Sequence, residues 1–293
     1  MTAESILGSY RIGDPGRAAL EVPPGLPGGC AAMSDIAASA ASVTGVQIRA
    51  AAVRGVRNLA QSRPRQDAFG LGHRRDAERE QAIAVVCGGV ATCGQPEEAA
   101  RLASRHLTGL AAAGVPWPAA FADASRVVSA HLAAALLAGR EPGEAGPARA
   151  GGTAAAGLIV HRDAGAWIGT AAWAGNCSIW HLTDAGQWIA LPSDQASGQG
   201  TGRRKLPPPL PSAQGACATA SLTITGGALF LMTSGVASPL KWSKHVQQTL
   251  ADWWATPPDP FTFAAQASFA RKSHVDDRTI VGLWPDHAGG RVP

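Results

Sequence analysis

The chain has 293 residues, of which 46% are hydrophobic and 16% charged, and a formal net charge of +4 at pH 7. This length is enough for one large domain or two small ones. The Arg and Lys residues of the chain are scattered and do not line one element, which argues against nucleic-acid binding. The sequence contains no apolar run of about 18 residues and no signal-peptide pattern, so we expect neither a membrane span nor secretion.

The first part of the chain predicts an extended arm followed by strands. Residues 1–45 are rich in Gly, Pro and Ala and are expected to have little structure of their own. Short apolar runs then predict three strands, at residues 46–55, 66–72 and 82–88.

Two long helical patterns come next, at residues 96–114 and 118–139. The first has Pro and acidic residues at its start and Gly at its end, which are typical helix boundaries. Both patterns are rich in Ala and are joined by a short Gly-Pro connection. We therefore expect an antiparallel pair of closely packed helices.

The apolar period changes to two in the second half of the chain, which is typical of strands. These strands are expected within residues 153–163, 166–176, 177–191 and 220–235. Residues 192–215 are polar and rich in Gly and Pro and predict a flap-like surface loop. An amphipathic helix at 239–255 and a strand at 276–284 close the chain. This order predicts an α+β domain over residues 46–293, most simply two antiparallel sheets with helices outside.

Short motifs in this order resemble those of the metal-dependent protein phosphatases of the type 2C (PPM) family. "RQDAF" resembles the family's first motif, with Asp67 as its aspartate, and "VVCGG" stands where the family has Ala-Asp-Gly-x-Gly. "MTSG" resembles the Ser/Thr-Asp-Gly motif and "VDDRT" the closing Asp-Asn/Asp-x-Thr motif. The resemblance covers about residues 47–284 and implies a four-layer α/β/β/α sandwich, two antiparallel sheets flanked by helix pairs, with a two-metal site at one end.

The resemblance also implies which residues occupy the former metal site, and most of them are not acidic. The family's bridging aspartate falls on Gly88, and two further aspartates fall on Asn176 and Ser234. The remnant positions are Asp67, Gly88, Gly89, Asn176, Ser234 and Asp276. We therefore interpret the glycines after residue 87 as the place where the family's metal-binding aspartate side chain is missing, which leaves a hollow.

This loss is chemically severe, because two divalent ions held close together require bridging and flanking carboxylates. Mg²⁺ and Mn²⁺ prefer charged oxygen ligands, and of the remnant set only Asp67 and Asp276 provide them. We expect no cofactor beyond at most one weakly held Mg²⁺ or Mn²⁺ ion at these two aspartates.

A soft metal at Cys87 and Cys93 is the alternative, but their spacing is not that of a zinc site and no His is near them in the sequence. Both are expected to be small buried hydrophobes. The odd number of cysteines without framework spacing favours free thiols in a reducing cytoplasm. The five are Cys30, Cys87, Cys93, Cys177 and Cys217.

Two arginines, Arg63 and Arg65, precede Asp67 and are candidates for binding an anion such as a phosphoryl group. The alternative is structural: Arg63, Arg65 or Arg278 neutralises Asp67 and Asp276. The histidines within strand and helix patterns, His161, His181 and His245, are expected to be ordinary, partly exposed side chains.

The sequence therefore predicts a catalytically degenerate type 2C-like phosphatase domain that acts as a binding or regulatory protein in the cytoplasm. Its expected partner is another protein, either a phosphoprotein or a kinase or phosphatase, with no role for nucleic acid or membrane. Two alternatives stay open. One is an enzyme repurposed around the hollowed pocket, and the other is a weak metal-dependent phosphatase of Ser/Thr phosphoproteins with recruited ligands.

Overall fold

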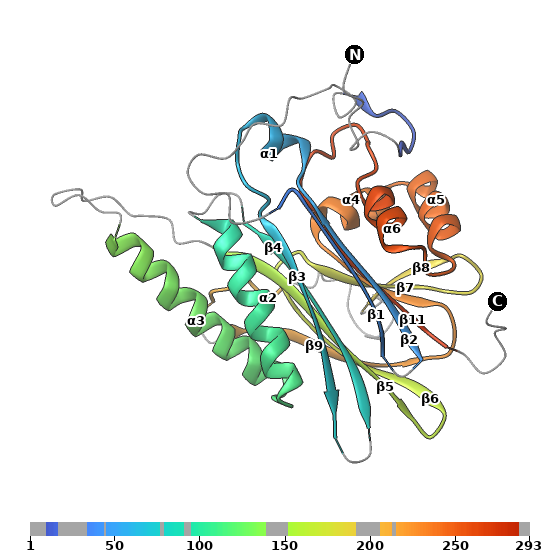
Figure 1. Cartoon of the computed structure of the whole chain (residues 1–293), viewed down its shortest axis with the longest axis horizontal. Coiled ribbons are helices and arrows are strands. Elements are labelled where there is room, and N and C mark those ends of the chain that lie inside the picture. The colour runs from blue at the N-terminus through green and yellow to red at the C-terminus, as the bar shows by residue number, and fades with distance from the viewer. Residues whose placement is uncertain are drawn as a thin grey trace, which may run out of the picture.

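The chain folds into two antiparallel sheets packed face to face between layers of helices (Figure 1). This is the α+β sandwich that the sequence predicts. The computed structural model describes residues 10–16, 34–43, 45–76, 79–90, 95–138, 152–191, 206–212 and 215–286.

The first sheet has six strands, in the order β1-β2-β11-β10-β7-β8. Its members come from both ends of the chain, so that the closing strand lies between β2 and β10. The strands are β1 (Ile36–Val43), β2 (Val46–Val53), β7 (Ser178–Leu182), β8 (Trp188–Leu191), β10 (Ala228–Met232) and β11 (Arg278–Pro285).

The second sheet has five strands, in the order β3-β4-β5-β6-β9. The strands are β3 (Asp67–Arg75), β4 (Glu80–Gly89), β5 (Thr153–Asp163), β6 (Ala166–Ala174) and β9 (Ala218–Ile224). Alternate residues of β4, such as Ala84 and Val86, face the first sheet and pack in one core with Leu229 and Leu231 of β10. This buried interface holds the two sheets together through apolar burial.

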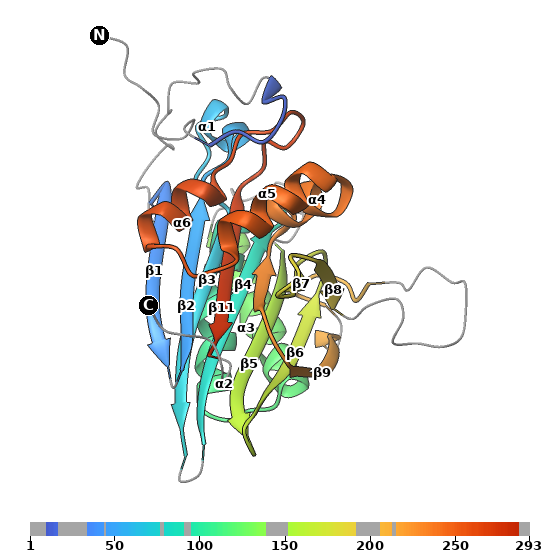
Figure 2. The same ribbon diagram turned by 90° about the vertical axis from the view of Figure 1, so that its right-hand side faces the viewer.

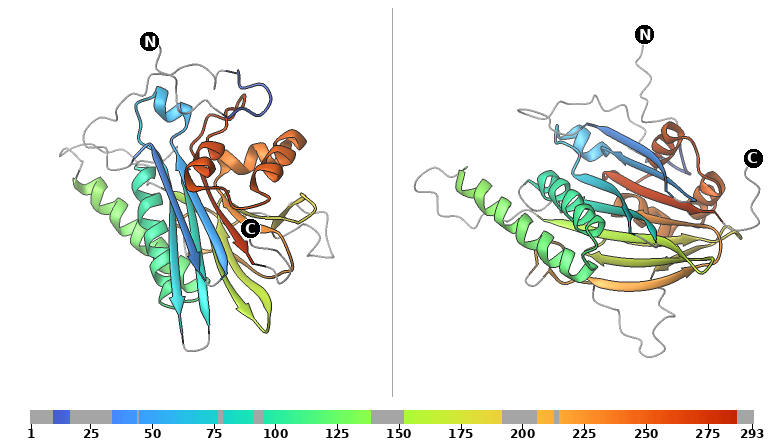
Figure 3. Two further views of the ribbon diagram at one scale, coloured as in Figure 1. Left: turned by 45° about the vertical axis from the view of Figure 1, so that its right-hand side comes forward. Right: turned by 60° about the horizontal axis from the view of Figure 1, so that its bottom comes forward.

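Helices cover the outer face of each sheet. Figure 3 shows α2 (Pro96–Ala112) and α3 (Trp117–Ala138) side by side against the five-stranded sheet, which confirms the predicted pair. The buried stripe of α2 consists largely of alanines at helical spacing, including Ala99, Ala103 and Ala111, which allows a close approach to the sheet. Among the described helices, none combines the length and apolarity needed to cross a membrane.

The other helix layer lies over the six-stranded sheet (Figure 2). It contains α4 (Ser234–Trp242), α5 (Lys244–Trp254) and α6 (Pro260–Ala267). A short helix, α1 (Val56–Ala60), connects β2 to β3 across the sheets. An aromatic cluster around Phe230 and Trp254, with ring centroids 5.5 Å apart, joins this layer to its sheet.

Several expectations from the sequence need correction. Residues 36–43 were expected in the arm but form β1, which pairs with β2 along its full length, so the domain begins before residue 46. The helix expected at 239–255 is two helices, because Ser243 is extended and caps α5 through the N–H of Val246. Most of the arm and of the 192–215 flap lies outside the described residues.

Two connections cross from one sheet to the other. The strands on either side of Gly226-Gly227, β9 and β10, lie in different sheets. The turn after β6 likewise leads to β7 in the other sheet. The crossing from β6 to β7 lies at the end of the sandwich where β3 begins, whereas the crossing from β9 to β10 lies at the opposite end.

Candidate functional site

Three of the remnant positions meet where β3 begins and β4 and β10 end. Asp67 and Gly88 are paired directly across β3 and β4. Thr233, the residue before Ser234, donates from its hydroxyl to Asp67 Oδ2 at 2.6 Å. The structure therefore brings Asp67, Gly88 and the Thr233-Ser234 turn together.

Thr233 links Asp67 to the first sheet. Its hydroxyl accepts from the backbone N–H of Thr279 at 3.0 Å, and its own N–H donates to the Thr279 carbonyl at 2.9 Å. Ser234 is the first residue of α4 and is half-buried. One Asp67 oxygen is thus part of a network that joins the two sheets.

Asp67 itself is only 6% exposed. Burial raises the pKa of its carboxyl to about 8, and the nearby carboxylate of Asp277 acts in the same direction. The hydroxyl of Thr233, the charge of Arg65 and the N–H of Gly89 oppose this rise. A metal ion that binds this carboxyl at neutral pH therefore has to displace a proton.

Asp277 is the acidic residue that sequence reasoning missed. Its carboxylate accepts from the N–H of Gly55 at 2.6 Å, from Asn58 Nδ2 at 2.9 Å and from the N–H of Gln66. Burial raises the pKa of Asp277, whereas these three donors lower it. Because the donors favour a charged acceptor, we assign the negative charge of the pair to Asp277 and the proton to Asp67.

Asp276 is directed away from this network. Its side chain is 50% exposed and pairs with Arg57, whose Nη1 lies 2.8 Å from Asp276 Oδ1. The expected partners of Asp276 were Arg63, Arg65 and Arg278, and the observed partner is a different arginine. Asn176 lies in an exposed turn after Gly175.

The three candidate arginines differ in accessibility. Arg63 is exposed. Arg65 is buried and donates from Nε to the Ser34 carbonyl at 3.0 Å and from Nη1 to the Asp67 carbonyl. Arg278 is buried, donates to three backbone carbonyls and stacks on Phe269 at 4.4 Å. Of the two candidate anion-binding residues, only Arg63 presents its side chain to solvent.

The buried thiols near Asp67 behave as small core side chains. Cys87 and Cys177 are both buried, as was expected for Cys87. Burial raises the pKa of each thiol, and the Asp67 carboxyl adds to the rise. Protonated thiols are poor nucleophiles and poor metal ligands. Cys93 lies outside the described residues.

The side chains at this end of the sandwich do not fit a bridged pair of divalent ions. In the part of the chain that the structure describes, no three side chains among His, Cys, Asp and Glu are grouped as a metal site would need. One oxygen of Asp67 is bonded to Thr233, and Asp276 is paired with Arg57. Gly88 contributes no side chain at the position where a bridging carboxylate would stand.

The sandwich of two sheets between layers of helices is the fold of the type 2C (PPM) protein phosphatases. A bacterial serine phosphatase superposes with a TM-score of 0.55 over 84% of this chain and 99% of its own, at 13% identity. Serine/threonine phosphatase Stp1 from Staphylococcus aureus gives 0.52 over 89% and 97%, at 11% identity. RsbX in complex with magnesium gives 0.50 over 85% and 100%, at 12% identity. The sequence matches no family model and no curated protein, so the likeness concerns the fold.

Proposed function

We propose that this chain is a catalytically degenerate PPM-fold protein that acts by binding another protein. The observation that carries the proposal is the pairing of Gly88 with a buried Asp67. In a two-metal hydrolase this position needs a bridging carboxylate to offset the repulsion between two cations. Glycine cannot supply one, and the single carboxylate of Asp67 cannot take the place of both.

The alternatives have less support. A metal-free reaction in the hollow would need an accessible nucleophile or base, but Asp67 and the thiols of Cys87 and Cys177 are buried. Burial keeps these thiols protonated, so neither is an activated nucleophile. A weak metal-dependent phosphatase would have to break the Arg57–Asp276 ion pair to free a carboxylate.

The binding role is supported by exposed positive charge beside the former site. Arg63 lies in the segment that leads into Asp67 and is exposed. Since Arg65 uses its guanidinium inside the protein, Arg63 is the residue that we assign to a phosphoryl or carboxylate group of the partner. The proposed partner is a phosphoprotein, or a kinase or phosphatase that acts on one.

The purified protein is expected to hydrolyse p-nitrophenyl phosphate or a phosphopeptide no faster than background in millimolar Mn²⁺ or Mg²⁺. The reason is the missing bridging carboxylate at Gly88, without which a metal-activated hydroxide is not formed. Initial rates with and without metal measure this directly. Turnover that is lost in Asp67→Ala or Asp276→Ala would instead identify a recruited metal site and overturn the proposal.

Arg63→Glu is expected to weaken binding of a phosphoprotein partner at least about tenfold, because a like charge replaces the proposed contact. Arg105→Glu is the matched control, since Arg105 is exposed on α2. Binding is measured by affinity capture with quantification of phosphoproteins, followed by titration of the captured partner. An equal loss of affinity in both variants would show that the effect comes from net charge and not from a contact of Arg63. An unchanged affinity in Arg63→Glu would place the interface elsewhere.

A further inference from the structure

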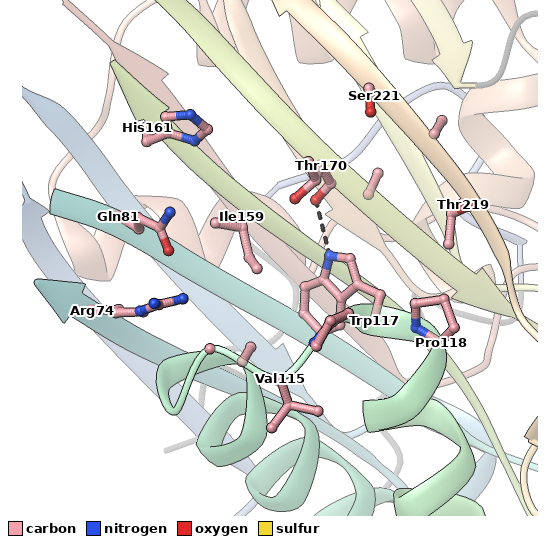
Figure 4. Close-up of a pocket in the computed structure, with 15 residues that line it drawn as sticks. Arg74, Gln81, Val115, Trp117, Pro118, Ile159, His161, Thr170, Thr219 and Ser221 are labelled. Atoms are coloured by element: carbon pink, nitrogen blue, oxygen red, sulfur yellow. Dashed lines mark hydrogen bonds between the residues drawn. The ribbon is translucent and has the colours of Figure 1, made fainter. Parts of the chain in front are cut away.

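A second cavity lies on the outer face of the five-stranded sheet, beside the connection from α2 to α3 (Figure 4). Its volume is about 550 Å³, which is within the range of sites for small molecules. Arg74 of β3 lines it, seven residues after Asp67 in the same strand. At the rise of an extended strand this separates the cavity from the former metal site by about 23 Å.

One end of the cavity is polar. Arg74, Gln81 and His161 line this end from three adjacent strands, β3, β4 and β5 (Figure 4). Among the described residues that line the cavity, Arg74 is the one that carries a charge at neutral pH, and no acidic side chain is present. Outside the lining, Asp76 lies 3.7 Å from Arg74. The wall itself therefore favours an anion.

His161 supplies an independent indication of a ligand. The residue is 8% exposed, and its buried Nδ1 has no hydrogen-bond partner within the described part of the chain. Burial and the charge of Arg79 lower the pKa of His161, whereas Asp163 and Asp76 raise it, so the ring is neutral at pH 7. A buried polar nitrogen without a partner is costly in a folded protein, and a polar group in the cavity would relieve this cost.

The opposite part of the cavity is apolar. Trp117 is 4% exposed, and its indole N–H donates to the Thr170 carbonyl at 3.1 Å. Because the indole N–H already has a partner, the Trp117 ring presents only apolar surface to the cavity, next to Val115 and Ile159 (Figure 4). Aromatic and aliphatic walls of this kind hold the body of a ligand.

The Arg74 side chain contacts Gly114, which follows the end of α2. Gly114 has φ +83, and a Cβ built on it would lie 2.5 Å from Arg74 Nη1. The guanidinium therefore lies against the backbone of Gly114, at the edge of the cavity.

We propose that this cavity binds a small amphipathic anion, an organic carboxylate whose charged group meets Arg74 and Gln81 and whose apolar body lies against Trp117. His161 provides a hydrogen bond to a polar atom of the same ligand. The planar guanidinium of Arg74 matches a carboxylate in two parallel hydrogen bonds. The site is independent of the former metal site and of the partner surface proposed at Arg63.

The probes are 2-naphthoate and its neutral analogue 2-naphthamide, titrated by isothermal calorimetry. The unmodified protein is expected to bind the carboxylate about tenfold more tightly than the amide, as one charge-assisted contact allows. Arg74→Gln should abolish this preference. Arg75→Gln is the matched control, because Arg75 is exposed on the same strand outside the cavity and should leave the preference intact.

A second pair of variants tests the cavity without changing charge. Ser221→Trp places a large ring at the cavity wall and is expected to remove naphthoate binding, whereas Thr223→Trp, on the same face of β9 outside the lining, should retain it. Absence of naphthoate binding at millimolar concentration in the unmodified protein would overturn the proposal. Equal binding by the unmodified protein and Arg74→Gln, or by both tryptophan variants, would also overturn it.

Discussion

Asp67→Asn is expected to stabilise the protein at pH 8, and the gain should shrink as the pH falls. Burial raises the pKa of Asp67 to about 8 in the folded protein, whereas an aspartate in the unfolded chain has a pKa of about 3.9. Between these values the folded state holds one more proton than the unfolded state, so wild-type stability falls as pH rises. Asparagine is neutral throughout, keeps an oxygen for the Thr233 hydroxyl and avoids this loss.

Each unit of pKa shift corresponds to ~1.4 kcal/mol. We therefore expect the gain from Asp67→Asn to be roughly 3 kcal/mol larger at pH 8 than at pH 5. Urea denaturation at several pH values measures it. Asp277→Asn is the matched control and should destabilise the protein at every pH, because an amide nitrogen would face donors from Gly55, Asn58 or Gln66. Destabilisation by Asp67→Asn at pH 8 would mean that Asp67 is ionised and paired with a cation.

Gly88→Asp together with Ser234→Asp is expected to restore affinity for Mn²⁺ by at least about a hundredfold, because two carboxylates are added beside Asp67. The space permits this change. A Cβ on Gly88 would lie 3.3 Å from Asp67 Oδ1 and 3.3 Å from Thr233 Cγ2, which demands only a small adjustment. Without metal the variant should be less stable than wild type, since the new carboxylates repel one another.

The neutral double variant, Gly88→Asn with Ser234→Asn, separates charge from shape. Both double variants place side chains of similar size at these positions, so only the acidic one should bind Mn²⁺ and recover stability in its presence. Calorimetry and thermal denaturation with and without Mn²⁺ make the comparison. Equal behaviour of the two variants would show that this end of the sandwich has been remodelled beyond the loss of its acids.

Periodicity predicted most of the elements of this fold, because the apolar spacing of strands and helices differs. It did not predict β1, since its Ala and Ser residues (Ile36–Val43) lack the large side chains that mark strands. It also could not assign strands to sheets. A Gly-Gly turn such as Gly226-Gly227 is compatible with a hairpin and with a crossing, and tertiary packing decides between them.

The candidate site was predicted only in part from the sequence. The motifs placed Asp67 and Gly88 at one end of the sandwich, where the two residues are directly paired across β3 and β4. They assigned Asp276 to the site and gave no role to Asp277, although adjacent residues in an extended segment point in opposite directions. The solvent-facing one pairs with Arg57, and the buried one accepts the backbone donors.

The second cavity had no signal in the sequence. Its polar residues come from three strands, and His161 was expected to be partly exposed but is buried. That expectation was wrong because His161 lies near the end of its strand in the sequence, where side chains are often exposed. In the structure β5 is an inner strand with β4 on one side and β6 on the other. Contacts between distant segments decide burial here.

We propose that the end of the sandwich at Asp67 and Gly88 does not hold a pair of divalent ions. Calorimetric titration of Mn²⁺ into the unmodified protein near neutral pH tests this claim most directly. We predict no saturable heat at micromolar metal and at most a weak, single-ion response at millimolar metal, because Asp67 is protonated and Asp276 is paired with Arg57. Saturable binding of two Mn²⁺ ions with micromolar Kd would contradict it and identify an active metal centre.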